Sequence, residues 1–169
     1  MFSYIIGIVT EKQEGMLVLE NNGIGYELLV SNNTISAISY DNEPVKLYTY
    51  FQVKEDGVAL YGFYTKEEKD LFIKIITVSG VGPKMAITML SSISISEFVN
   101  AILNEDVKML CTVKGLGKKT AERVVLELKD KIDVIGMPSK TPLENAVNED
   151  ALNDATEALI TLGVGKNEA

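Results

Sequence analysis

The sequence contains one glycine-rich turn twice, as TVSGVGPKMA at residues 77–86 and as TVKGLGKKTA at residues 112–121. The copies lie 35 residues apart and share the frame T-V-x-G-(V/L)-G-x-K-x-A. In each copy an amphipathic stretch runs into the two glycines, and a second helix begins directly after them. Glycine permits a positive φ angle and lets another molecule approach the backbone closely. The repeat therefore predicts two helical hairpins joined by the same type of turn.

The residues around the glycines fit a turn that exposes main-chain amides. Val81 and Leu116 stand between the glycines, and we expect their side chains to pack into the two hairpins. Pro83 suits the first position of the following helix, where its missing N–H would have no helical partner. Each turn then directs several N–H groups outward at a helix N-terminus, which is a ready site for an anion.

Lysine follows the second glycine of each copy, at a position that folding alone disfavours. Lys84, Lys118 and Lys119 fall in the first turn of a helix, where a cation opposes the helix dipole at a cost of about 0.3–1 kcal/mol each. Arg123 extends the same face one turn further. A nucleic-acid phosphate, held by backbone N–H groups and a flanking cation, would explain this arrangement. Paired hairpins would then hold both strands across a minor groove, by shape rather than by base sequence.

A purely structural explanation of the turn is the alternative. A single G-x-G between two helices is commonly a helix C-cap that runs into the next helix, with no ligand involved. Two copies in one frame, each with the electrostatically unfavourable lysine, favour phosphate binding.

The charge distribution also points to this part of the chain. The net charge of the 169 residues is −8, which taken alone argues against nucleic acid. However, eleven of the sixteen basic residues lie within residues 63–135, which contain both turns. Because the Debye length is about 8 Å at physiological salt, a ligand senses that local patch rather than the total charge.

Several absences exclude classes of chemistry. The chain has no histidine and one cysteine, which excludes histidine-based catalytic triads and histidine- or cysteine-rich metal sites. It also lacks the G-x-x-x-x-G-K-(S/T) pattern of ATP-binding loops. These absences do not exclude catalysis as such, but the usual groups for it are missing, and we predict no catalytic residue, no metal ligand and no cofactor.

The single cysteine and the apolar pattern bear on location. Cys111 cannot form an internal disulfide, so we expect a reducing, cytoplasmic compartment, and we expect its side chain to be a small buried core residue. No stretch approaches the roughly 18 apolar residues of a membrane helix, so we expect no membrane contact.

The first 64 residues predict a small closed β-barrel. Five short runs rich in β-branched and aromatic residues are separated by Gly, Asn or Asp: MFSYIIGIV, GMLVLENN, GIGYELLVS, VKLYTYFQV and GVALYGFY. Four tyrosines of this part, Tyr48, Tyr50, Tyr61 and Tyr64, could stack on bases as in barrels that bind single strands. Barrel packing or a subunit interface is the interpretation we prefer.

Residues 65–135 change to a helical pattern of roughly five short helices. Thr65 with Glu68 and Ser94 with Glu97 each have the spacing of a capping box at a helix start. The last helix of this part is expected at about 118–132, with Val124, Val125, Leu128 and Ile132 directed inward.

The C-terminal part predicts a linker and one further helix. Residues 136–150 mix Pro, Ser, Thr and Asn without periodicity, as is typical of a flexible linker. Residues 151–169 contain one amphipathic helix that ends at Gly163. Since a lone helix of this length is marginal in water, either it docks elsewhere or the sequence stops partway through a longer C-terminal module, and we favour the second.

The doubled hairpins GVGPK and GLGKKTAERV, preceded by a barrel that ends in FQVKEDGVALYGF, closely resemble the RuvA family of bacterial Holliday-junction-binding proteins. The resemblance runs from residue 1 to about 133 and more loosely to 169. It implies a multidomain β plus α fold with an OB-like N-terminal barrel, a central all-α double helix-hairpin-helix domain and a C-terminal helical domain. The family's third domain is a three-helix bundle, of which this sequence offers only a part.

The function implied is that of a non-catalytic subunit, without cofactor, in DNA recombination and repair. The resemblance implies a homotetramer, with one or two tetramers on the DNA, that recognises four-way junctions and holds them open and square-planar. Through the third domain it would direct a RuvB-type hexameric ATPase in branch migration. A RuvC-type resolvase is a further partner of the family, and the incomplete third domain puts coupling to the motor in doubt.

The resemblance also assigns the site residues. It places DNA contacts at Gly80, Val81, Gly82, Lys84, Gly115, Leu116, Gly117, Lys118, Lys119, Thr120 and Arg123. It matches Glu55 and Asp56 of the stretch KEDG to the acidic pin of the family, which would repel phosphates at the junction crossover. From the residues alone this stretch is also an ordinary hairpin tip, since Asp-Gly is a common turn signal.

Two other function classes compete with this one. A helix-hairpin-helix DNA-repair enzyme of the glycosylase or nuclease type would need a base-flipping pocket or a metal-binding acidic cluster, and the sequence indicates neither. An acidic protein-interaction adaptor would show no salt-sensitive DNA binding.

Overall fold

The computed structural model describes residues 2–39, 43–55 and 57–132 of the chain. All of them belong to one compact unit, Met1–Gly136. The predicted linker and C-terminal helix, and with them the predicted domain boundaries beyond residue 135, lie outside the described residues.

Five strands form a closed barrel in the order β1-β2-β3-β5-β4. Neighbouring strands are antiparallel except β3 and β5, which run parallel. The strands are β1 (Tyr4–Gln13), β2 (Met16–Asn21), β3 (Ile24–Val30), β4 (Val45–Lys54) and β5 (Gly57–Phe63). The five predicted strands and the predicted closure are thus confirmed.

The barrel interior follows from the alternation of apolar residues, because successive side chains of a strand point to opposite faces. Leu17, Leu19, Leu28 and Leu47 are fully buried inside it. Gly7 is required where β1 passes β2, since a Cβ atom there would lie 2.2 Å from the carbonyl oxygen of Glu20.

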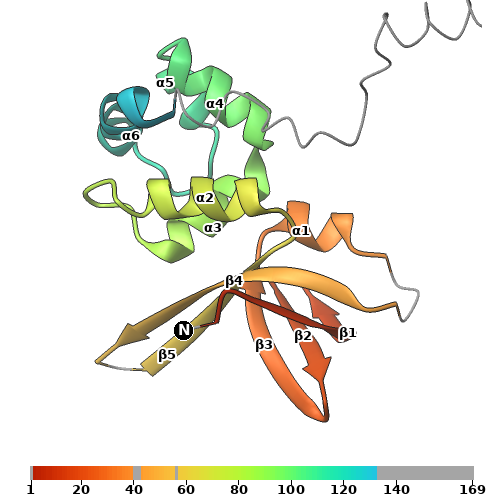
Figure 1. The fold of residues 1–169 in the computed structure, drawn as a ribbon. Helices are drawn as coiled ribbons and strands as arrows, with labels where there is room; N and C mark the ends of the chain where they lie inside the picture. Colours follow the sequence, from red (N-terminus) through yellow and green to blue (C-terminus); the bar gives the residue numbers. More distant parts are fainter. Residues whose placement is uncertain (1, 40–42, 56, 133–169) are drawn as a thin grey trace, which may run out of the picture. The chain divides into compact units, whose positions relative to one another are not determined.

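Six helices complete the described part of the chain (Figure 1). A short helix that the sequence did not predict, α1 (Asn32–Ala37), lies between β3 and β4. The other five gather at one end of the barrel and match the number expected. They are α2 (Lys66–Ile75), α3 (Pro83–Ser92), α4 (Ile95–Leu103), α5 (Val107–Leu110) and α6 (Lys118–Ile132).

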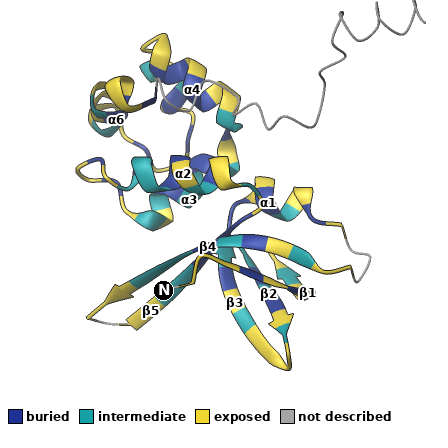
Figure 2. Cartoon of the chain, viewed as in Figure 1, coloured by how far each residue is buried: buried dark blue, intermediate teal, exposed yellow. Residues whose placement is uncertain are grey.

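The helices share one apolar core that continues into the barrel. The inner faces of the helices are buried in Figure 2, and the four residues predicted to face inward on α6 are all buried. The same cluster includes Tyr61 and Phe63 of β5. The ring of Phe72 on α2 lies 4.8 Å from that of Phe63, 5.3 Å from that of Tyr61 and 5.4 Å from that of Tyr50.

These contacts decide the role of three of the four tyrosines. Tyr61 is buried, while Tyr48 and Tyr50 are half-buried against the helical core. Burial, with a smaller contribution from Tyr50, raises the pKa of the Tyr61 hydroxyl. Packing therefore accounts for these three side chains, and Tyr64 is the exposed one.

One of the two predicted capping boxes is complete. Ser94 accepts a hydrogen bond from the Glu97 amide, and the Glu97 carboxylate accepts one from the Ser94 amide. Hydrogen bonds from the Ser94 side chain and backbone lower the pKa of Glu97. At the other site the Thr65 hydroxyl accepts a hydrogen bond from the Glu68 amide at 3.1 Å. The Glu68 carboxylate, however, accepts hydrogen bonds from Ser31 and Thr34 instead of from the Thr65 amide. The prediction of a capping box at Thr65 and Glu68 was therefore wrong.

Cys111 is exposed, which contradicts the prediction of a core residue. It follows the last residue of α5, a short helix whose Leu110 is the buried residue.

Among the described residues no single helix is long and apolar enough to cross a membrane. Only α3 and α4 taken together, bent by 102° at their junction, have the length and apolar composition for it.

Candidate nucleic-acid interface

The two glycine-rich turns have the same hydrogen-bond pattern at the predicted spacing. In the first turn, the Val81 amide donates to the Val78 carbonyl at 3.0 Å and the Ala86 amide donates to the Gly82 carbonyl at 3.0 Å. The second turn repeats both bonds 35 residues later, at 3.1 and 2.9 Å. The sequence repeat is therefore a repeat of backbone geometry.

The two glycines of each turn serve different purposes. Gly80 and Gly115 have φ angles of +87° and +84°, a conformation that favours glycine. Gly82 and Gly117 have no positive φ, are exposed, and leave open space where a Cβ atom would lie. The second glycine is thus not needed for the turn itself, but it keeps the helix N-terminus accessible.

The side chains between and after the glycines also lie as predicted. Val81 and Leu116 are 5 % and 6 % exposed and pack into the helical core. Pro83 begins α3, whose N-cap residue Gly82 makes no side-chain capping bond. Neither α3 nor α6 has an acidic residue in its first turn. The first amides of α3 thus receive no capping side chain.

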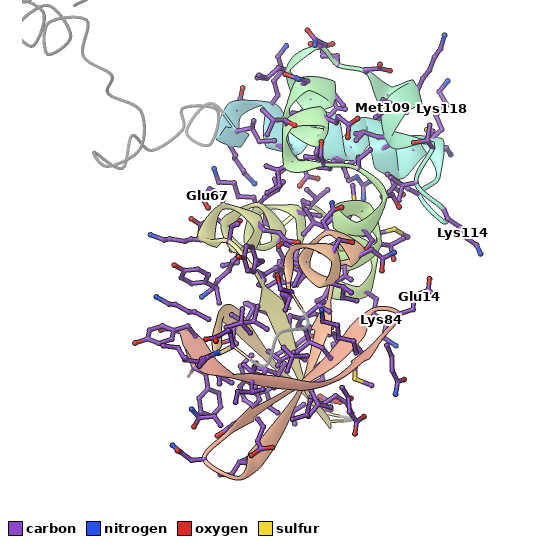
Figure 3. All side chains as sticks on the ribbon, turned by 90° about the vertical axis from the view of Figure 1, so that its right-hand side faces the viewer. Glu14, Glu67, Lys84, Met109, Lys114 and Lys118 are labelled. Carbon is purple, nitrogen blue, oxygen red and sulfur yellow. The ribbon has the colours of Figure 1, made fainter. Side chains whose placement is uncertain are left out.

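Exposed lysines surround these helix starts. Lys84, Lys118 and Lys119 are exposed, and Lys118 lies 3.8 Å from Glu122 in an exposed i,i+4 pair. Figure 3 shows Lys84 and Lys118 on the same side of the molecule, with Glu67 on the opposite side. Among the described residues the side chains of Lys84 and Lys119 have no hydrogen-bond or ion-pair partner.

Sequence reasoning missed one lysine of this group. Lys114 directly precedes the first glycine of the second turn, is exposed, and projects from the same side as Lys118 (Figure 3). The first turn has Ser79 at this position. The signal was available in the repeat, because the variable x of the frame T-V-x-G is a lysine in one copy and a serine in the other.

Arg123 has a structural role that its spacing did not indicate. Its Nη1 donates to the Ser79 carbonyl at 3.2 Å and lies 3.3 Å from the Ser79 hydroxyl. Its Nε lies 4.0 Å from Glu127, whose carboxylate accepts a hydrogen bond from the Ser79 amide at 3.4 Å. Arg123 and Glu127 of α6 therefore attach the first turn to the second hairpin.

Three further basic residues near the turns, Lys74, Lys129 and Lys131, are engaged with the protein. Lys129 forms an ion pair with Glu105, and its hydrogen bond lowers the pKa of the Glu105 carboxyl. Lys74 donates to the Lys131 carbonyl at 2.5 Å, and Lys131 donates to the Thr77 hydroxyl at 3.3 Å. The cationic surface is thus concentrated at the helix starts rather than along α6.

Outside the turns, the predicted acidic tip is described only in part. Glu55 is exposed at the end of the β4–β5 hairpin, and Asp56 lies outside the described residues. Val53 and Val58, which pair across the two strands, are also exposed. The hairpin therefore has an exposed carboxylate at its end, and an exposed pair of valines on the two strands just before it.

A helix-hairpin-helix repair enzyme would need a metal-binding acidic cluster or a base-flipping pocket. No group of three or more acidic, histidine or cysteine side chains that could hold a metal ion occurs among the described residues. An open depression of about 700 Å³ lies beside the second turn, and its lining has no aromatic residue. It is lined by Asn104, Glu105, Asp106, Val107, Lys108, Cys111 and Lys118.

A closed five-stranded barrel followed by two helical hairpins with accessible, lysine-flanked turns defines a class of DNA-binding protein, the tandem helix-hairpin-helix proteins. A family model described as "SAM-like Helix-hairpin-helix tandem" matches residues 72–130, and one described as "RuvA N terminal domain" matches residues 1–62.

Curated relatives specify the family. The chain is 42 % identical over 174 residues to the "Holliday junction branch migration complex subunit RuvA" of Ruminiclostridium cellulolyticum, covering 100 % of this chain and 87 % of the relative. The same name belongs to relatives from Thermoanaerobacter pseudethanolicus, 44 % identical over 169 residues with 100 % and 87 % coverage, and from Legionella pneumophila, 43 % identical over 171 residues with 100 % and 86 % coverage. The chain belongs to the RuvA family.

Proposed function

We propose that this chain is the DNA-binding subunit of a branch-migration complex and that it recognises four-way junctions. The observation that carries the proposal is the repeated turn: two helix starts with the same backbone geometry, open space at the second glycine and exposed lysines beside both. The name of the relatives, a subunit of a Holliday junction branch migration complex, supports it.

The binding mechanism follows from the turns. Amides at the start of α3 and α6 donate to phosphate oxygens, and the lysines neutralise the phosphate charge. Because the proposed contacts are to the sugar-phosphate backbone, the duplex is recognised by its shape rather than by its bases. The proposed contacts are Gly80, Val81, Gly82, Lys84, Gly115, Leu116, Gly117, Lys118, Lys119, Thr120 and Arg123, and Lys114 is added to them.

The acidic tip acts at the crossover. Glu55 and Asp56 of each protomer repel phosphates there, which keeps the strands apart and discourages continuous duplex from occupying the same surface. Such residues lower affinity while they improve specificity. The exposed position of Glu55 at the hairpin end supports this role.

The barrel is proposed as the platform of a homotetramer. An apolar stripe runs along the outer face of β1 and continues to Phe2, and its four large side chains are 39–50 % exposed: Phe2, Tyr4, Ile6 and Ile8. A stripe of this kind is typical of a surface that another subunit covers. One or two such tetramers bind a junction in the cytoplasm.

The motor function belongs to a partner. A RuvB-type hexameric ATPase pumps the DNA arms and contacts the C-terminal domain, and a RuvC-type resolvase acts on the same junction. This chain itself is non-catalytic. Incubation of labelled junction DNA with the pure protein and Mg²⁺ checks this point, because cleavage would favour a helix-hairpin-helix repair enzyme instead.

The central test compares binding to four-way, linear and single-stranded DNA over a range of salt concentrations. We expect a preference for the four-way junction. Replacing Lys118 and Lys119 by Ala should weaken binding and lower the slope of log K against log salt by about 0.9 for each phosphate that is no longer neutralised. Lys66→Ala removes one positive charge at the far end of α2, about 15 Å of helix away from the first turn, and should leave the slope unchanged. A slope that does not respond to the double substitution contradicts the proposal.

A further inference from the structure

A cluster of polar groups joins the barrel to the first hairpin and belongs to neither turn. Residues 31–34 (SNNT) cap and begin α1 on the barrel side, and Glu68 lies in the first turn of α2. These five residues are called the polar clamp below. Three of them, Ser31, Thr34 and Glu68, are buried polar residues of the described structure.

The centre of the polar clamp is the Glu68 carboxylate, which is 5 % exposed. Ser31 Oγ donates to its Oε1 at 2.5 Å, and Thr34 Oγ1 donates to its Oε2 at 2.6 Å. The two hydroxyl oxygens in turn accept hydrogen bonds from backbone amides, those of Thr34 at 3.0 Å and of Tyr64 at 3.1 Å. A carboxylate is costly to bury without such partners. The buried Glu68 carboxylate of α2 must therefore stay opposite the hydroxyl groups of Ser31 and Thr34 at α1.

The other side of the polar clamp contacts the end of α3. Asn33 Nδ2 donates to the carbonyls of Leu90 and Ile93 at 2.6 and 3.3 Å. The backbone N–H of Asn32 donates to the Ser91 hydroxyl at 3.0 Å. The last carbonyls of a helix have no partner within the helix, so these bonds satisfy groups that need one. The polar clamp therefore contacts both helices that flank the first turn, one at its start and one at its end.

An apolar contact between α2 and the barrel lies beside the polar clamp. Phe72 of α2 packs on Phe63 and Tyr61 of the barrel. Apolar burial stabilises this interface but has little directional preference, whereas hydrogen bonds require both a distance and an angle. The polar groups are thus the more directional of the two contacts between the first hairpin and the barrel.

We propose that the polar clamp is a positioning device that fixes the direction in which the first hairpin presents a DNA arm relative to the barrel. This inference rests on the proposed function. A tetramer binds a junction tightly only when several hairpin pairs contact their arms at once, and that gain depends on how well the sites are held in place. Duplex binding at a single hairpin pair does not need the polar clamp, because none of its residues lies in a turn.

The first experiment compares Glu68→Ala with Glu67→Ala. We expect Glu68→Ala to reduce the preference for four-way over linear DNA by about five- to tenfold, with unchanged affinity for linear duplex. Glu67 is exposed on the same turn of α2, so its substitution removes the same charge and should change neither affinity. If Glu68→Ala does not fold, Glu68→Gln replaces it in every measurement, with a smaller loss in the same direction.

The second experiment measures the orientation directly. Cys111 is the one cysteine of the chain and is exposed, so a spin label there and another at Glu20→Cys on the exposed barrel surface report the distance between the two parts. Labelled chain is diluted with unlabelled chain to remove distances between protomers. We expect a narrow distance distribution in the otherwise unchanged protein and a broader one in Glu68→Ala.

Three outcomes decide between the possibilities. A distribution in Glu68→Ala as narrow as that of the unchanged protein overturns the inference, whatever the DNA result. A broader distribution with an unchanged junction preference also overturns it, because the orientation would then not matter for recognition. If replacing Lys118 and Lys119 by Ala lowers affinity for neither DNA, the proposed function has failed, and the distance distribution alone decides whether the polar clamp sets the orientation.

Discussion

The two glycines of the first turn make separable demands, and substituting each by Ala tests that separation. At Gly80 the φ angle of +87° would hold Ala in a left-handed conformation, at a cost of about 1–2 kcal/mol. At Gly82 the φ angle is −92°, and a Cβ atom would meet nothing within 4 Å. Ala there reduces the entropy of the unfolded chain, a gain of about 0.4–1 kcal/mol, and is a poorer N-cap than Gly by roughly 0.5–1 kcal/mol. These two effects nearly cancel.

The effects on DNA binding should have the opposite order, with Gly82→Ala the more damaging of the two substitutions. In the proposed complex a phosphate oxygen approaches the amides at the start of α3, and the new methyl group of Gly82→Ala occupies that approach. A hydrogen bond to a charged group contributes about 1.5–3 kcal/mol, so the loss of one should raise the Kd for duplex DNA about ten- to hundredfold. Gly80→Ala should instead lower the midpoint of thermal unfolding by roughly 3–10 °C for a unit of this size.

Thermal unfolding followed by circular dichroism and a fluorescence-anisotropy titration with labelled duplex measure the two effects on the same samples. We expect Gly82→Ala to unfold within about 2 °C of the unchanged protein and to bind DNA poorly. A Gly82→Ala protein that is stable and binds DNA normally would refute the assignment of this helix start to a phosphate. A large loss of stability in Gly82→Ala would refute the inference that its surroundings are open.

Three further substitutions test other parts of the site. Lys114→Ala should lower the salt slope of duplex binding by about 0.9, and an unchanged slope would remove this lysine from the contacts. Glu55→Gln combined with Asp56→Asn should raise affinity for linear duplex more than for the junction, and equal discrimination by competition titration would contradict the acidic tip. Arg123→Gln should lower the free energy of unfolding by about 0.5–1.5 kcal/mol, measured by urea titration, because its bond to Ser79 is lost; unchanged stability would show that this bridge is not needed.

Features that depend on local pattern were predictable from the sequence. The five strands follow from period-two alternation and their turn residues, and α6 begins and ends at the predicted residues. The turn geometry followed from the glycine frame, since a positive φ at Gly80 and Gly115 is something that only a few residue types accept readily. The buried Val81 and Leu116 followed for the same reason, because the frame leaves one direction for the side chain between the glycines.

Features that depend on distant partners were not predictable. Thr65 with Glu68 and Ser94 with Glu97 are the same local motif, yet only the second forms a capping box. Glu97 is exposed and keeps its local partner, whereas Glu68 is buried against two hydroxyl groups at α1 that come more than thirty residues earlier. No rule based on local spacing indicates that Glu68 has these distant partners. The α1 helix itself is six residues long, too short to produce a helical period, and Ser31 at its N-cap was the only signal.

The same argument explains why two copies of one turn differ in what surrounds them. The frame constrains the glycines and the residues that pack inward, but leaves x in T-V-x-G free. In the first copy x is Ser79, which is held by Arg123 and Glu127, and α2 and α3 are held by the polar clamp. In the second copy x is Lys114, which projects outward. The first hairpin is therefore the one attached to α1 through the polar clamp, and the second carries most of the exposed charge. A duplication that only served folding would have no reason to divide these tasks, whereas a pair of hairpins that must both orient and bind a DNA arm does.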